Sequence, residues 1–374
     1  MTPRTRRFPI RLLVILTLFV GLGYIGSAYG GMVNPLVTAV PAVLAMTFPF
    51  WLLALAITFV LSLLFRSRVS LIISLVSFIA GWGGLTTFCP LNFSDTDDLS
   101  VNDTTGSSFT ILTYNLFELN AYNGQYPDET NLTVQAIIDA NPDIVAMQEA
   151  PPMPSVGYRF TSTSQSDSLI RRYPYRLNTA GIGLLSRFPA RFAPVPEPSP
   201  DNGSFHFRHF LIDLPDGSVL SLYNVHLESF GLSDDDKKLY RKLTNGEVRH
   251  RIMKARRILI SKLASAFRSH AEQSMQLCRC IEADTCSSII VCGDFNDIPG
   301  SYAIRTLSRH AGLSDAYVDA GFGATPTYHV NRFYFHIDQI LYRGDISPLR
   351  VVRVPEGASD HYPVMARFSV NSDH

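Results

Sequence analysis

The first 93 residues of this 374-residue chain contain no aspartate or glutamate, and no charged residue occurs between Leu12 and Phe65. The few charges in this region are all arginines: Arg4, Arg6, Arg7, Arg11, Arg66 and Arg68. Charged residues make up 17% of the chain, below the ~25% of ordinary soluble domains. These deficits exclude a wholly soluble protein and a disordered one. The balance of 32 basic and 32 acidic residues also argues against a strongly basic nucleic-acid binder.

The uncharged run is too long for a single membrane span. As one helix it would reach about 80 Å, whereas a bilayer core of ~30 Å needs only ~20 residues. We therefore expect it to fold back near Gly30–Pro35, and a further apolar run follows Arg68. About three transmembrane helices are predicted, near 11–30, 43–65 and 69–88. Because Pro41 and Pro49 interrupt the middle run, a re-entrant or buried segment over 35–65 is the alternative.

The arginines predict the orientation of this anchor, residues 1–93. Positive residues favour the cytoplasmic side, so the arginine cluster at 4–11 and the Arg66/Arg68 step both belong in the cytoplasm. The remainder of the chain is then extracytoplasmic, with a multi-pass anchor and a cytoplasmic N-terminus. Reading the first span as a signal peptide would leave the large domain on the same side. Residues 94–108 are polar and hold four aspartates, which is typical of a linker.

From 109 to 374 the pattern becomes that of a mixed α/β domain. Residues 109–114 and 143–148 have strand composition, and a helix is expected over 130–140, ending at Asn141-Pro142. A longer helix is expected over 246–268. Further strands are predicted at 181–186, 205–213, 218–226, 288–293, 336–342, 349–354 and 362–370.

Three of the five cysteines, Cys278, Cys280 and Cys286, are close together in the sequence, in a segment expected to be a loop. On an oxidising side of the membrane this favours one disulfide to Cys286, although the pairing stays open. A zinc site built from them would lack a fourth ligand.

Acid, amide and imidazole residues follow the ends of the predicted strands. Strand ends in α/β folds are where ligands bind, because a rigid sheet positions the residues there. Each could have a structural role alone, but so many in one domain indicate a site. They are Asn115, Glu149, His226, Asp294, Asn296, Asp338, Asp360 and His361.

The residue types indicate a phosphate site with a hard metal ion. Mg²⁺ prefers oxygen ligands, which Asn115, Glu149 and Asp360 could supply. An aspartate beside His361 would keep its ring protonated, facing the charge that develops on a phosphate. The histidines lack the spacing of a zinc pair, no phosphate-binding G-x-x-x-x-G-K-[ST] loop occurs, and Ser186 lacks a G-x-S-x-G elbow.

The order of these motifs resembles the endonuclease/exonuclease/phosphatase superfamily. The matching segments are Thr-Tyr-Asn115, Gln148-Glu149, Asn224-Val-His226, Gly293-Asp294-Phe-Asn296, Ile337-Asp338 and Ser359-Asp360-His361. The resemblance spans about residues 109–370. It implies an α/β four-layer sandwich with two central β-sheets flanked by helices, and hydrolysis of P–O bonds with Mg²⁺, or Mn²⁺.

The resemblance also implies roles for individual residues. Glu149 would be the main metal ligand, with Asn115 beside it and Asp360 helping. The catalytic residues would be Asp294, which orients and deprotonates water, Asn296, which positions it, and His226, which binds a phosphate oxygen. His361, oriented by Asp338, would stabilise the transition state or protonate the leaving group. Many members carry arginine where this chain has His336, so substrate contacts there stay open.

These features predict a membrane-anchored, outward-facing phosphodiesterase or phosphatase. Its partners would be a lipid bilayer and a phosphate-ester substrate, either a lipid headgroup, a small phosphodiester or nucleic acid; no protein partner is evident. A nuclease acting outside the cytoplasm is the alternative, and an inactive binding or scaffold domain is a third hypothesis. The intact set of acidic and histidine residues argues against the third.

Overall fold

The computed structural model describes residues 3–93, 108–120, 130–152, 162–194, 206–231, 252–330, 334–355 and 358–371. The predicted linker lies outside these ranges except for Ser108, which begins the first strand. The predicted boundaries between anchor, linker and catalytic domain stay a prediction.

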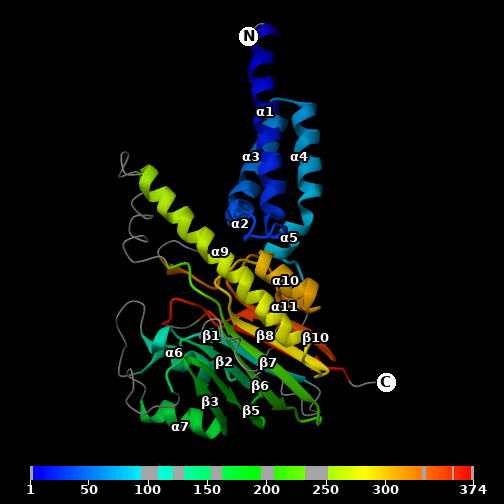
Figure 1. The fold of residues 1–374 in the computed structure, drawn as a ribbon. Coiled ribbons are helices and arrows are strands. Elements are labelled where there is room, and N and C mark those ends of the chain that lie inside the picture. The colour runs from blue at the N-terminus through cyan, green and yellow to red at the C-terminus, as the bar shows by residue number, and fades with distance from the viewer. Residues whose placement is uncertain are drawn as a thin grey trace.

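Two six-stranded sheets form the centre of the large domain (Figure 1). The first has the order β11 (Ile346–Arg353), β12 (Val364–Val370), β1 (Ser108–Asn115), β2 (Ile144–Gln148), β4 (Ile182–Ser186) and β3 (Tyr175–Thr179). The second has the order β5 (Ala190–Phe192), β6 (Phe207–Asp213), β7 (Val219–His226), β8 (Ser288–Asp294), β10 (Asp338–Gly344) and β9 (Ser314–Asp315). Each sheet contains one parallel pair at its centre, β1 with β2 and β7 with β8.

Helices cover the outer face of each sheet. The first sheet packs on α6 (Leu132–Ala140) and α7 (Thr163–Arg172), and the second on α9 (Ile252–Glu282) and α10 (Tyr302–His310). A separate buried cluster joins the inner faces, where Ile111 and Leu184 of one sheet meet Phe210 and Ile290 of the other. The expected four-layer α/β sandwich is therefore confirmed. Because β2 and β8 are covered on both faces, every residue in them is buried.

Two of the three clustered cysteines lie in a helix, contrary to expectation, while Cys286 lies in a loop. Helix α9 continues to Glu282, so Cys278 and Cys280 lie on its last turns. Cys278 points into the core and is 1% exposed. All five cysteines are free thiols, so the expected disulfide to Cys286 is wrong.

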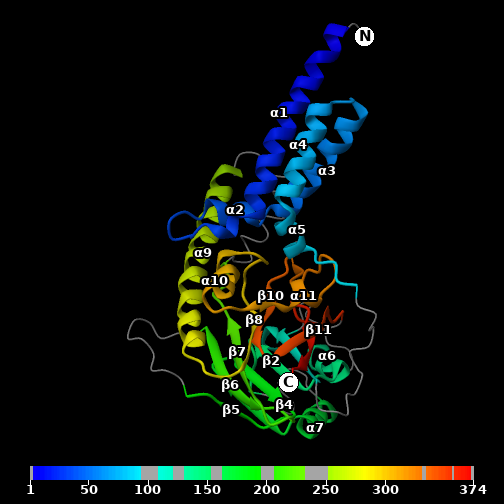
Figure 2. The same cartoon turned by 90° about the vertical axis from the view of Figure 1, so that its right-hand side faces the viewer.

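The N-terminal region is a bundle of helices standing on one end of the sandwich (Figures 1 and 2). It consists of α1 (Pro3–Ala28), the short η1 (Gly30–Met32), α2 (Val40–Ala45), α3 (Phe48–Leu64), α4 (Arg68–Ala80) and α5 (Trp82–Phe88). Within the described residues, one segment, Pro9–Ala28, is long and apolar enough to cross a membrane. Helices α4 and α5 taken together are also long and apolar enough to cross a membrane, but the chain bends by 57° between them. Helix α3 is apolar but shorter than a membrane span. The expectation of about three transmembrane helices is therefore too high by length and composition.

The packing of this bundle is the reverse of a helix bundle in water. Small hydroxyl residues are buried between the helices: Thr17, Ser27, Thr58, Ser62, Ser70, Ser74 and Ser77. Large apolar side chains are exposed: Leu12, Ile15, Phe19, Leu53, Ile57, Val60, Ile72, Leu75 and Ile79. Close helix contacts explain the small residues, since a Cβ on Gly21 would lie 2.3 Å from Ser77 Oγ. Small residues between helices and apolar side chains outside are typical of membrane bundles.

The base of the bundle is docked tightly on the sandwich. A Cβ on Gly31 would lie 2.0 Å from the carbonyl oxygen of Gly300, so this contact requires glycine. Arg268 Nε donates to Pro35 O at 3.4 Å, and Asn92 Nδ2 donates to Val318 O at 2.8 Å. The bundle and the sheets therefore share a defined interface.

Candidate active site

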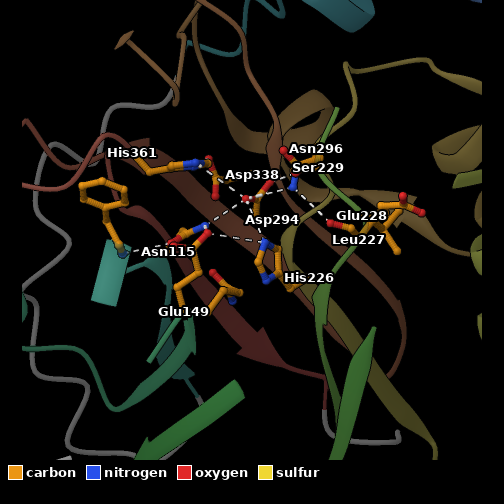
Figure 3. A network of polar contacts seen from close by, with 12 residues as sticks. Asn115, Glu149, His226, Leu227, Glu228, Ser229, Asp294, Asn296, Asp338 and His361 are labelled. Atoms are coloured by element: carbon orange, nitrogen blue, oxygen red, sulfur yellow. Dashed lines mark hydrogen bonds and ion pairs between the residues drawn. The ribbon is translucent and has the colours of Figure 1, made fainter. Parts of the chain in front are cut away.

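The predicted site residues meet where the two sheets end below the helix bundle. Asn115 is the last residue of β1, and Glu149 follows β2. His226 ends β7 and lies opposite Asp294, the last residue of β8, while Asp338 opens β10 opposite the same residue. Figure 3 shows their side chains converging from both sheets. Strand register therefore brings together residues far apart in the sequence.

Asp294 lies at the centre of this cluster and is 1% exposed. Its Oδ2 accepts hydrogen bonds from Asn115 Nδ2 at 3.0 Å and Asn296 Nδ2 at 3.3 Å. The Nε2 atoms of His361 and His226 lie 3.6 and 3.7 Å from the same oxygen. One buried carboxylate oxygen is thus surrounded by four nitrogens from four segments of the chain.

Asp338 and His361 form a buried pair. His361 Nδ1 lies 2.9 Å from Asp338 Oδ2, and Asp338 is fully buried. Burial alone would lower the pKa of His361, but the charges of Asp338 and Asp294 outweigh it and raise that pKa to about 10. The ring is therefore an imidazolium at neutral pH, with Nε2 directed at Asp294.

Glu149 lies on the more open side of the site, with 35% of its side chain exposed. Its Oε1 accepts from Asn115 Nδ2 at 3.1 Å and lies 3.7 Å from His226 Nε2. The backbone of Glu149 has a left-handed φ of 46°, which is uncommon for a non-glycine residue. Such conformations cluster at functional sites, where surrounding contacts hold them in place.

The turn after β8 fixes Asp294 and Asn296 together. Gly293 has a φ of 144°, and a Cβ there would lie 1.9 Å from Val225 O, so the approach of β7 to β8 requires glycine. The backbone N–H of Asn296 donates to Asp294 Oδ1 at 2.8 Å, and its Nδ2 also donates to Leu227 O at 3.1 Å. Both motif residues are thus held by the backbone around them.

The Ser359–His361 segment closes the site from the first sheet. Ser359 Oγ donates to the carbonyl oxygen of Asn115 at 2.7 Å, which attaches this segment to the end of β1. Asp360 lines the same cavity as Glu149 and His361. All eight predicted site residues are therefore grouped at one location, although their roles stay predictions.

The donor set fits a divalent cation. The carboxylates of Glu149 and Asp294 both approach Asn115 Nδ2, at 3.1 and 3.0 Å, so they lie close together. In the described part of the chain, atoms of Asp294, Asp338 and His361 also lie within 4.8 Å of one another, although the protonated ring of His361 has no lone pair to give a metal ion. Asp338 Oδ1 is buried and has no hydrogen-bond partner among the described residues. Carboxylates packed this closely repel each other unless positive charge lies between them. Asn115, a predicted metal ligand, presents Nδ2 to the carboxylates, while its Oδ1 accepts from Phe117 N at 3.0 Å.

Two amides that support the site were not assigned roles from the sequence. Gln148 Nε2 donates to Asn224 Oδ1 at 2.6 Å, and Asn224 Nδ2 donates to Met147 O at 3.0 Å. This buried bridge joins β2 of the first sheet to β7 of the second, directly behind Glu149 and His226. Gln148 and Asn224 lie in the motifs Gln148-Glu149 and Asn224-Val-His226. Their position just before a site residue was the signal from which a supporting role could have been predicted.

A second supporting pair lies behind the β8 turn. His270 of α9 lies 3.2 Å from Asp297 through Nδ1, and its Nε2 lies 2.6 Å from Glu228 O. His270 is 1% exposed, so this pair attaches the helix to the segment that follows Asn296. His270 lies just beyond the helix predicted over 246–268, and nothing in the sequence indicated this contact.

His336 lies outside the cluster. Its Nδ1 is 2.7 Å from Thr325 O, and its ring packs 4.5 Å from that of Tyr317. Burial lowers the pKa of His336 to about 4, so the ring is neutral. Directly before Ile337-Asp338, the chain therefore has an uncharged ring packed into the domain.

Comparison with known proteins agrees with this architecture. The family model described as the endonuclease/exonuclease/phosphatase family matches residues 112–361, so the chain belongs to this family of phosphoester hydrolases. A model described only as a domain of unknown function matches residues 10–88. A search of curated proteins gave no match.

Similar solved structures cover most of the domain at low identity. An endonuclease/exonuclease/phosphatase from Beutenbergia cavernae has a TM-score of 0.47 at 16% identity over 71% of this chain and 72% of its own. Sphingomyelinase C from Streptomyces griseocarneus has a TM-score of 0.41 at 17% identity over 70% of this chain and 99% of its own. A beta toxin from Staphylococcus aureus with bound magnesium ions has a TM-score of 0.39 at 14% identity, covering 69% and 99%.

Proposed function

We propose that the protein is a membrane-anchored hydrolase of phosphate esters that depends on Mg²⁺ or Mn²⁺. The observation that carries this proposal is the convergence of Glu149, Asp294 and His361 from separate segments of the chain onto one cavity. A buried carboxylate beside an imidazolium can handle both protons of a hydrolysis, one at the attacking water and one at the leaving group.

Glu149 would hold the metal ion, with Asn115 and Asp360 beside it. These residues supply the oxygen ligands that Mg²⁺ prefers, with water and substrate phosphate completing its coordination. Asn115 would have to turn its amide for its oxygen to take part, since Nδ2 now faces Glu149. When bound, the ion polarises the phosphoryl oxygen and offsets its negative charge.

The other residues would move protons and position the phosphate. Asp294 accepts a proton from the attacking water, which Asn296 helps to position. The new bond joins the water oxygen to phosphorus as the bond from phosphorus to the leaving oxygen breaks. His361, held by Asp338, donates a proton to that leaving oxygen. His226, 3.7 Å from both Glu149 and Asp294, would donate to a phosphate oxygen.

We also propose that the N-terminal bundle anchors the domain in a membrane, with the catalytic domain on the extracytoplasmic side. Support comes from the bundle's exposed apolar and buried hydroxyl residues. The junction between α3 and α4, which carries Arg66 and Arg68, lies at the end of the bundle far from the sandwich (Figure 1). The N-terminal end of α1 lies at that end too. Positive residues at that end favour the cytoplasm.

Activity of the full chain in detergent tests the chemistry. With Mg²⁺ or Mn²⁺, the protein is expected to hydrolyse bis(p-nitrophenyl) phosphate, and a chelator should stop the reaction until metal is restored. Asp294→Ala should lower kcat at least ~10²-fold, the usual scale for an acid–base group. Glu149→Ala should lower it on a similar scale, because it removes the main metal ligand. Asp213→Ala, which removes an exposed carboxylate from the surface of β6, is the matched control. If the wild type and Asp294→Ala both fail to hydrolyse the ester, the result would favour an inactive scaffold protein.

A further inference from the structure

The cavity that contains the site has two unlike sides. It holds about 370 Å³, within the usual range for ligand pockets. One side carries the polar site residues Glu149, Asp294, Asn296, Asp360 and His361. The other is apolar: Val43, Met46 and Phe50 come from the N-terminal bundle, and Phe230, Leu259 and Leu263 come from the large domain. A ligand that fills both sides must be polar at one end and apolar at the other.

The apolar side is a fixed part of the molecule. Ala42 of α2 is buried against Leu263 and Phe267 of α9, and Val43 and Met46 pack on the same cluster. Gly31 and Gly300 meet in a contact that leaves no room for a side chain. The bundle therefore contributes a wall to the site in addition to any anchoring role.

An exposed apolar stripe leads away from this wall along α3. Phe50 lines the cavity and is 70% exposed. Residues three and four apart lie on one face of a helix, and the same face of α3 continues with exposed side chains. They are Leu53 at 60%, Ile57 at 52%, Val60 at 53% and Leu64 at 71%. At 1.5 Å per residue the stripe is about 20 Å long, comparable to much of a bilayer's hydrocarbon thickness.

The charge of the cavity separates two classes of substrate. Nucleic acids are bound largely through lysine and arginine contacts to successive phosphates. Among the described residues that line this cavity there is neither lysine nor arginine. The described lining therefore offers no positive charge to a second phosphate.

We propose that the substrate is a lipid with a phosphate-ester headgroup, which enters from the bilayer along α3. Its phosphate lies between Glu149, Asp294 and His361, and the first part of its hydrocarbon chain lies against Val43, Met46 and Phe50. The N-terminal helices are thus specificity-determining elements of the enzyme. This inference rests on the proposed hydrolase function and names its substrate class.

A series of p-nitrophenyl alkyl phosphate diesters tests the inference. The full chain, in micelles of a non-ionic detergent with Mg²⁺, is assayed with ethyl, octyl and hexadecyl esters, which share one leaving group. We expect kcat/KM to rise with chain length. Met46→Ser and Val43→Ser should lower the hexadecyl-to-ethyl ratio of kcat/KM by about tenfold, since each removes an apolar contact. Met46→Leu, which keeps the apolar volume, should retain the ratio.

Ile72→Ser is the matched control, because Ile72 is 62% exposed on α4 and does not line the cavity. It should keep the wild-type ratio. Hydrolysis without chain-length dependence, or a ratio that Met46→Ser leaves unchanged, would overturn the lipid inference while the hydrolase proposal stands. Nicking of plasmid DNA faster than turnover of the hexadecyl ester would overturn it in favour of a nuclease. If wild type and Glu149→Ala are equally inert on every ester, the proposed function itself fails.

Discussion

At the scale of single residues, the site depends on how each polar side chain is held. Asp294 receives two side-chain hydrogen bonds on Oδ2 and a backbone one on Oδ1, so its carboxylate has little freedom. His361 is held by Asp338 at 2.9 Å. A catalytic group fixed in this way needs little reorganisation during the reaction.

Replacement of Asp338 by asparagine tests the His361 pair. The change keeps the shape of the side chain but removes the charge that does most to keep His361 protonated. We expect kcat on bis(p-nitrophenyl) phosphate to fall about 10²–10⁴-fold, as for loss of a general acid. The fold is expected to survive, which circular dichroism would check. Activity equal to wild type would remove His361 from the proposed mechanism.

His336 predicts a pH dependence of stability. Its pKa is about 4 in the folded chain and 6.5 when unfolded, so the unfolded state takes up a proton first as pH falls. The stability from its neutral form is present above pH 6.5 and is lost as pH approaches 4. The loss is at most about 3 kcal/mol by linkage.

Thermal unfolding at several pH values measures this effect. Between pH 6.5 and 4, the Tm of wild type should fall more steeply than that of His336→Gln, which cannot titrate. Parallel curves for the two proteins would contradict the assignment.

At the scale of elements, the strands that carry the site were the ones that sequence reasoning found. Both faces of β2 and β8 are buried, so they appear as apolar runs ending in polar motif residues. The strands missed are short or at sheet edges, and the helix α10 was also missed. β3 and β5 are largely exposed, and β9 has two residues. The polar helix α7 was missed despite a capping box between Ser162 and Gln165.

The contacts between elements could not be predicted in the same way. The extent of α9 and its packing under α2 depend on tertiary contacts, and no local pattern near Cys278 marked a helix. The motif series indicated which side chains form the site, whereas the apolar wall from α2 and α3 became visible only once the bundle was seen on the sandwich.

The amide bridge between the sheets gives a prediction at this scale. Asn224→Leu would leave Gln148 Nε2 and the carbonyls of Met147 and Gly183 without this partner. We expect a loss of about 1–3 kcal/mol in the free energy of unfolding, the cost of unsatisfied buried groups. Chemical denaturation measures it. Asn371→Leu, at an exposed amide, is the control and should be nearly neutral; equal effects would refute a special role for the bridge.

At the scale of the whole molecule, the helix bundle and the sandwich act as one unit. Their interface is built on Gly31, whose Cβ position is already occupied by Gly300 O. Gly31→Ala should therefore push the bundle from the sandwich and destabilise the protein by about 1–3 kcal/mol, as overpacking does. Gly83→Ala is the control, because the nearest atom to its Cβ would be Tyr29 Oη at 3.5 Å, an ordinary contact. Equal Tm values for the two variants in detergent would show that the docking is loose.

The central claim is that Glu149, with Asn115 and Asp360 beside it, holds one divalent cation next to Asp294 and His361, and Mn²⁺ binding measured by electron paramagnetic resonance tests it most directly. The full chain in detergent is titrated with Mn²⁺, and the free ion is followed by its signal. We predict one bound ion per chain in the wild type and at least a tenfold weaker affinity in Glu149→Gln, which loses a charged ligand. Undiminished binding in Glu149→Gln, or no binding in the wild type, would contradict the account.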